Sequence, residues 1–240
     1  SSAASDVYKR QDQGRFLHKV SGDLASISSG IEANLIVDHE RRRSIERHHS
    51  ATHVLNWALR KVLGTHVRQA GSYVDSERLR FDFAHFEAIK PEELAEIEKL
   101  CNEHLLDNSA VRWFETPFDQ KPNDVIAFFG ERYGDVVRVV DIGGFSKELC
   151  GGTHVRATGE IGLIKISSES AIAAGTRRIE AIVGNSLYSH INEIEQLIAT
   201  ASQSLSTAPA DLLKKIDSLL TRNSELEKQL KKFQQKASGN

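Results

Sequence analysis

The sequence predicts an α+β domain followed by a helical region, and two observations carry that prediction. Up to about residue 185, segments with a 3.6-residue apolar period are interspersed with short apolar runs typical of strands. From about residue 186 the strand signals stop, and long helical patterns take over. Hydrophobic residues make up 40% of the chain and charged residues 27%, as in ordinary globular proteins.

The first strong helix prediction covers residues 44 to 64, where apolar residues follow the helical period and Gly64 ends the run. A hairpin is predicted at residues 72 to 83, because its second half alternates polar and apolar side chains. A second helix is predicted at residues 91 to 106, since Pro91 occupies a favoured start position and acidic residues follow it. Cys101 lies within that helix and is expected in the core.

Four further segments are predicted as strands. The runs at 125 to 129 and 136 to 140 are continuously apolar, as in buried strands, and a turn at 133 to 135 separates them. Residues 161 to 166 and 179 to 183 follow with similar composition. Ahead of all these elements, residues 15 to 38 alternate around glycine-centred turns, which predicts short antiparallel strands.

The C-terminal region contains an apolar seam spaced alternately by four and three residues. Such spacing is typical of a coiled coil, in which Asn223 at an a position can fix the register. The seam is short, so it predicts equally a coiled-coil homo-oligomer or an intramolecular hairpin with residues 186 to 205, turned at Pro209. Its members are Leu212, Ile216, Leu219, Asn223, Leu226, Leu230 and Phe233.

Two pairs of metal-capable side chains are the main functional signal. His49 and His53 are spaced to lie on one face of the first helix, and Cys150 and His154 flank two glycines that permit a tight turn. Three imidazoles and one thiolate suit zinc best, so we predict one Zn²⁺ bound by all four. The alternative is a small buried cysteine with ordinary surface histidines, which leaves the paired spacing unexplained.

The same pattern excludes one class of enzyme and leaves another question open. Residue 50 is serine, so the helix lacks the glutamate that serves as the base of His-Glu-x-x-His metalloproteases. Four simultaneous protein ligands would make a closed, structural site, whereas displacement of one would let water or substrate coordinate. The sequence does not choose between these.

Charge and composition bound the partners and the compartment. The net charge of −2 gives no overall basic footprint. Basic residues cluster at 41 to 43 with Arg47, which fits a solvated face as well as phosphate contact, and at Arg177 and Arg178, which better suit phosphate. No segment has transmembrane length, and two cysteines fit a reducing cytoplasm. The absence of methionine predicts a piece of a longer protein, and residues 1 to 11 are expected to be a tail or a leader.

Five stretches in order resemble the editing domain of alanyl-tRNA synthetase. They are residues 43 to 71, with HHSATH and the Q-x-G-S sequence at Gln69, then LRFDF at 79 to 83, FGERYGDVVRVV at 129 to 140, FSKELCGGTHV at 145 to 155 and GTRRIEAIVG at 175 to 184. The resemblance covers residues 12 to 235. Threonyl-tRNA synthetase shares the metal pairs but resembles the chain less around LRFDF. The sequence departs from the family at His48, where asparagine is usual, and this leaves a one-residue ambiguity in the ligand set.

The resemblance implies domains at 12 to 42 (remnant of a β-barrel), 43 to 185 (two-layer editing domain with zinc) and 186 to 240 (helices leading toward a further domain). It implies hydrolysis of tRNA(Ala) mischarged with serine or glycine, with the tRNA 3′ end as partner. The family's ATP-dependent attachment of alanine needs a catalytic core that these motifs do not include, so ATP is expected only there.

Within that reading, Gln69, Cys150, Thr52 and Thr153 are expected at the reaction site, the threonines because they adjoin the ligands. The arginines expected to contact tRNA are Arg43, Arg47, Arg177 and Arg178. Two alternatives remain: a zinc-stabilised module that binds tRNA and dimerises without turnover, and a free-standing alanyl-tRNA editing protein.

Overall fold

The structure is a computed structural model of the 240-residue chain, and it describes residues 11–12, 15–16, 29–30, 32, 34, 36–127 and 133–237. The chain divides into two compact units, Ser1–Leu187 and Tyr188–Asn240. In the first unit, strands β1 (Gln11–Asp12) and β2 (Arg15–Phe16) pair antiparallel. Most of the predicted barrel remnant at 12 to 42 lies outside the described residues, so that prediction stays untested.

Helix α1 (His39–Leu63) is the central element of the first unit. It begins five residues before the predicted start, because the Asp38 side chain accepts a hydrogen bond from the Arg41 N–H and caps the helix. It ends as predicted at Gly64, whose φ of 115° is one that side chains disfavour. One face of α1 is buried along its length and includes Ile45, Leu55 and Leu59.

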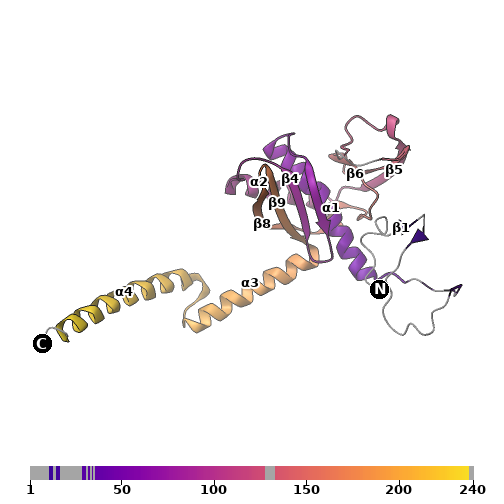
Figure 1. The fold of residues 1–240 in the computed structure, drawn as a ribbon. Helices are drawn as coiled ribbons and strands as arrows, with labels where there is room; N and C mark the ends of the chain where they lie inside the picture. The colour runs from indigo at the N-terminus through magenta and orange to yellow at the C-terminus, as the bar shows by residue number, and fades with distance from the viewer. Residues whose placement is uncertain are drawn as a thin grey trace. The chain divides into compact units, whose positions relative to one another are not determined.

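A four-stranded antiparallel sheet lies against this helix, and Figure 1 shows both helices of the first unit beside it. Its order is β3 (Gln69–Val74), β4 (Leu79–Ala84), β9 (Thr176–Val183) and β8 (Ile164–Ala173). Phe81 and Phe83 of β4 pack with Ile179 of β9 in the core formed with α1 and with α2 (Pro91–Leu106). The predicted hairpin and second helix are confirmed, and Cys101 is buried in this core.

A separate three-stranded antiparallel sheet has the order β5 (Val111–Pro117), β6 (Val136–Ile142), β7 (Ser146–Leu149). The predicted strand at 125 to 129 is wrong for residues 125 to 127, where Ile126 makes only an isolated bridge to Glu148; residues 128 and 129 lie outside the described part. The run at 161 to 166 is also only partly a strand. A 3-10 turn, η3 (Thr158–Ile161), precedes β8, because Gly162 breaks the extended conformation with a φ of 78°. A second such turn, η2 (Phe118–Gln120), follows β5.

Two helices account for the rest of the described chain: α3 (Gly184–Ser204) and α4 (Leu212–Ala237), with the turn η4 (Pro209–Asp211) between them. Within the second unit they do not pack along one another, so the predicted intramolecular hairpin is not formed. The apolar seam of α4 is exposed, with Leu226 50% and Phe233 71% accessible. The mixed α+β class is confirmed, and none of the described helices meets the length and apolarity of a membrane span.

Candidate metal centre

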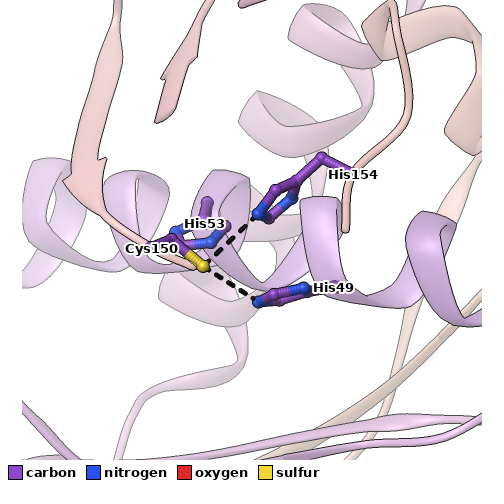
Figure 2. A group of neighbouring side chains, drawn as sticks. All are labelled: His49, His53, Cys150 and His154. Carbon is purple, nitrogen blue, oxygen red and sulfur yellow. Dashed lines mark hydrogen bonds between the residues drawn. The ribbon is translucent and has the colours of Figure 1, made fainter. Parts of the chain in front are cut away.

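The four predicted ligands converge on one point (Figure 2). Their ligand atoms all lie within 4.8 Å of one another. Cys150 Sγ is 3.4 Å from His49 Nε2 and 3.3 Å from His154 Nε2. Zinc bonds of about 2.3 Å to sulfur and about 2.0 Å to nitrogen, at tetrahedral angles, place such atoms about 3.5 Å apart. The spacing therefore fits one tetrahedral ion.

Two elements far apart in the sequence supply the ligands. His49 and His53 project from successive turns of α1, while Cys150 directly follows β7 and its N–H donates to the Arg138 carbonyl of β6. Gly152 lies so close to His49 that an added Cβ would stand 2.1 Å from Cε1 of the imidazole. Glycine is therefore required at 152 for space, and not for the dihedral freedom that the sequence suggested.

Each ligating histidine is held through its other ring nitrogen. Nδ1 of His49 donates to the Thr153 carbonyl at 3.1 Å, and Nδ1 of His154 donates to the Ser50 hydroxyl oxygen at 3.1 Å. Nδ1 of His53 donates to Glu148 at 2.5 Å, and its buried Nε2 has no hydrogen-bond partner among the described residues. With all three Nδ1 atoms occupied, all three Nε2 atoms are available to a metal.

Glu148 is the functional residue that the sequence analysis missed. It is 2% exposed, and its second oxygen accepts from Asn56 Nδ2 at 2.7 Å. A carboxylate that fixes a ligating imidazole is the usual second partner of such sites. No local pattern marks it in the sequence, because β7 (SKEL) is mostly polar and His53 lies 95 positions away.

The pKa values of the cluster favour a thiolate. Burial alone would raise the pKa of Cys150, but the neighbouring imidazoles of His154, His49 and His53 outweigh it and lower the pKa to about 2. Burial lowers the pKa of His154 to about 3, which keeps that imidazole neutral. Burial would also lower the pKa of His53, but the Glu148 carboxylate raises it to about 10. Thiolate and neutral imidazole are the forms that bind metals, so Cys150 and His154 are already in their binding forms at neutral pH, whereas the His53 ring must lose one proton when an ion binds.

His48 does not belong to the cluster, which removes the one-residue ambiguity. Its side chain is fully buried, with Nδ1 donating to the Ser44 carbonyl and Nε2 accepting from the Val183 N–H of β9. Burial lowers its pKa, consistent with a neutral ring that accepts at one nitrogen and donates at the other. It joins α1 to the four-stranded sheet.

The remaining predicted reaction-site residues lie around the cluster without joining it. The Thr52 hydroxyl donates to the His48 carbonyl one turn earlier, so its hydrogen is committed within the helix. Thr153 contributes its carbonyl to His49, and its side chain is exposed. Gln69 donates to the Ser72 hydroxyl at 3.3 Å from the first residue of β3.

Two cavities are lined by residues next to the cluster, although none of the four ligands lines either cavity. The smaller, about 320 Å³, includes Gln69, Asn56 and Ile126 in its lining. The larger, about 580 Å³, includes Trp113, Arg138 and Gly151. Both sizes suit small ligands or parts of larger ones. Gln69 therefore shares a cavity with Asn56, the residue that donates a hydrogen bond to Glu148.

The four arginines expected to contact tRNA all have protein partners. Arg178 makes two hydrogen bonds to Asp82, at 2.7 and 2.8 Å, and Arg177 makes two to Glu169. Arg43 pairs with the Glu160 carboxylate at 3.2 Å, and Arg47 donates to the Glu160 carbonyl at 2.9 Å. These contacts give each arginine a structural role, and its contact with tRNA stays a prediction.

Comparison with known proteins adds to this geometry. Residues 137–180 match the family described as threonyl and alanyl tRNA synthetase second additional domain. The chain is 54% identical over 230 residues to an alanine--tRNA ligase of Opitutus terrae, covering 94% of this chain and 24% of that protein. The corresponding protein of Hydrogenovibrio crunogenus is 50% identical over 94% of the chain and 26% of its own length. The alanine--tRNA ligase of Acetivibrio thermocellus is 44% identical over 95% of this chain and 26% of its own length.

These relatives extend well beyond the matched region, since the chain spans about a quarter of their length. The family match contains Cys150 and His154, while His49 and His53 lie in the part covered by the longer alignments. The chain is therefore related, over nearly its whole length, to one segment of the alanine--tRNA ligases, a segment that includes the second additional domain.

Proposed function

We propose that the chain binds one Zn²⁺ through His49, His53, Cys150 and His154, and hydrolyses tRNA(Ala) mischarged with serine or glycine. The single observation that carries this proposal is the convergence of three oriented Nε2 atoms and one thiolate in a domain related to aminoacyl-tRNA synthetases. Alanine ligation, the activity in the relatives' name, would need ATP and is not assigned to these residues.

Zinc is the preferred ion because the donor set and the spacing match it. Three imidazole nitrogens and a thiolate are borderline to soft ligands, which disfavour magnesium and calcium. When bound, zinc would supply a positive charge that orients or polarises a ligand oxygen or nitrogen. Four protein ligands favour orientation of the substrate, with water attacking the ester carbonyl and the terminal ribose hydroxyl leaving.

Helix α1 offers a place for the aminoacyl group. His49, His53 and Asn56 follow one another at helical spacing, so Asn56 lies about 10 Å along the helix from His49. Its Nδ2 is held by Glu148, and its buried Oδ1 has no partner among the described residues. That oxygen is an acceptor for the amine or hydroxyl of an aminoacyl group. We assign the aminoacyl group to the smaller cavity, where Gln69 adds a polar side chain.

The test is release of labelled serine from seryl-tRNA(Ala), beside alanyl-tRNA(Ala), with zinc content measured on the same sample. We expect serine release with the alanyl ester spared, and loss of both zinc and release in Cys150→Ala. Retention of zinc and activity in that variant would contradict the proposal. Asn56→Ala should keep its zinc and lose discrimination between the two esters, which separates recognition from metal binding.

A second function is favoured by one observation, the closed set of four protein ligands. A closed site is typical of structural zinc, so the chain could serve as a tRNA-binding module that pairs through the exposed seam of α4. This alternative predicts tRNA binding without turnover, a dimer in solution and unfolding on chelation. Repeated turnover of seryl-tRNA(Ala) by a monomeric protein would exclude this alternative.

A further inference from the structure

The larger cavity contains an exposed aromatic side chain that the proposed chemistry does not use. Trp113 of β5 is 61% accessible, although a tryptophan is costly to leave in water. Glu115 lies two residues along β5 on the same face, and it stands opposite Arg138 of β6, which is thus the diagonal neighbour of Trp113. These three side chains line the cavity together with Val136, Val137 and Gly151.

Arg138 connects this aromatic side chain to the metal loop. Its guanidinium carbon lies 4.6 Å from the centre of the Trp113 ring, and Nη1 donates to the Gly152 carbonyl at 2.8 Å. Gly152 in turn lies against the imidazole of His49. A molecule bound on the Trp113 ring is therefore separated from His49 of the metal cluster by only the Arg138 side chain and Gly152.

From this arrangement we propose that Trp113 and Arg138 form a stacking site for one nucleobase of a single-stranded RNA 3′ end. The inference rests on the proposed function, because it makes that 3′ end the occupant. Aromatic rings and arginine planes are the surfaces on which unpaired bases stack. The carboxylate of Glu115 disfavours a phosphate in this cavity and can accept from the amino group of cytosine or adenine.

The two cavities then divide the substrate. Gly152 adjoins His49 and follows Gly151 of the larger cavity, whereas Asn56 of the smaller cavity lies two turns further along α1. The larger cavity is therefore nearer the His49 end of the cluster, and the smaller cavity is nearer the Asn56 end. A base held on Trp113 leaves the terminal ribose near the ligands and the aminoacyl group toward Asn56. This order matches the connectivity of an aminoacyl-tRNA end, in which the ester lies between base and amino acid.

Tryptophan fluorescence gives a test that does not require hydrolysis. The chain has two tryptophans, and Trp57 packs against His104 and Phe145, so Trp57→Phe leaves Trp113 as the only reporter. We expect an uncharged acceptor minihelix ending in CCA to quench this fluorescence. A minihelix with an abasic tail, which keeps the phosphates, should not. Equal quenching by both tails would overturn the stacking site.

Binding and kinetics complete the test. Trp113→Ala should raise Kd for the CCA minihelix and KM for seryl-tRNA(Ala) about ten-fold, with kcat little changed, and Trp113→Phe should restore most of the loss. Phe86→Ala, at an exposed aromatic outside the cavity, is the matched control and should change neither. Unchanged KM in Trp113→Ala with normal turnover would overturn this inference alone. Base-dependent quenching without any serine release would support the site and contradict the hydrolytic function.

Discussion

The two sheets of the first unit differ in how they pair their arginines. In the four-stranded sheet Arg177 and Arg178 each donate two hydrogen bonds to a carboxylate of a neighbouring strand. In the three-stranded sheet Arg138 has a ring and a carbonyl as its described partners, and its Nε is buried without a hydrogen bond. An arginine held by two hydrogen bonds to a carboxylate stabilises the fold, whereas one that stacks on an aromatic ring can also take part in stacking a planar ligand. The functional surface is therefore expected on the three-stranded side.

The largest effect should come from the loop that joins this sheet to the ligands. Gly152→Ala places a Cβ against the His49 ring and must displace it, so we expect zinc affinity to fall by more than about 100-fold. Competition with a chromophoric chelator measures this. Gly134→Ala, where the nearest atom to an added Cβ is 3.8 Å away, is the control and should bind zinc normally. Normal affinity in Gly152→Ala would show that the loop tolerates a shift of His49.

Removal of the carboxylate behind His53 should have the next largest effect. Glu148→Ala leaves Nδ1 of His53 and the amide of Asn56 without their acceptor, and we expect zinc affinity to fall about 10- to 100-fold. Glu148→Gln keeps one acceptor oxygen and should lose less. The same chelator competition tests both, and equal losses in the two variants would argue that charge, and not orientation, is what Glu148 supplies.

The four-stranded sheet should respond in stability and not in metal binding. Asp82→Asn weakens the pair with Arg178, whose side chains are 9% and 31% exposed, so we expect a loss of about 2 kcal/mol in the free energy of unfolding. Urea denaturation measures the loss, and zinc content should not change. Arg178→Ala should behave alike. If it kept its stability and lost tRNA affinity, the predicted contact of Arg178 with tRNA would be supported and its structural role contradicted.

The smallest effect should come from a surface pair beside the three-stranded sheet. Lys147 donates to Asp124 and lowers the pKa of that carboxyl below its ordinary value of 3.8. Because the folded-state pKa is lowered, any stabilisation is present above pH 3.8 and is lost as the pH falls through the lowered value. Asp124→Asn should leave the urea midpoint at pH 7 unchanged, since exposed pairs contribute little. A clear fall at pH 7 would mark this pair as structural.

Local patterns predicted what local physics determines. Helix α2 and the β3–β4 hairpin were predicted because capping, periodicity and turn chemistry act over a few residues. The ligand quartet was predicted because each pair has its own short spacing. Strands β5 and β7 were not predicted, because they are defined by their pairing with β6 and their own residues show no clear strand pattern.

Contacts between distant residues were beyond such patterns. Arg178 and Asp82 lie 96 positions apart, so their pairing follows from the strand register and not from any local pattern, while the predicted contact of Arg178 with tRNA stays a prediction. The alternation of LRFDF predicts an exposed Asp82, whereas the structure buries this carboxylate, and a buried acid needs a cation. Trp113 gave no comparable sign, because exposure on a sheet face depends on which side the helices cover.

The separation of the ligand pairs has a consequence for the folding of the chain. Cys150 and His49 lie 101 positions apart, and strands β5 to β7 lie between α1 and Cys150. An ion held by both pairs would bind only the folded chain, in which the pairs meet across this long loop, so its binding free energy would add to the free energy of unfolding. Amide hydrogens of β5 and β6 should therefore exchange faster after chelation, while those buried under α2 change less. Such a difference in exchange would show that the metal slows local opening of the sheet that carries Trp113.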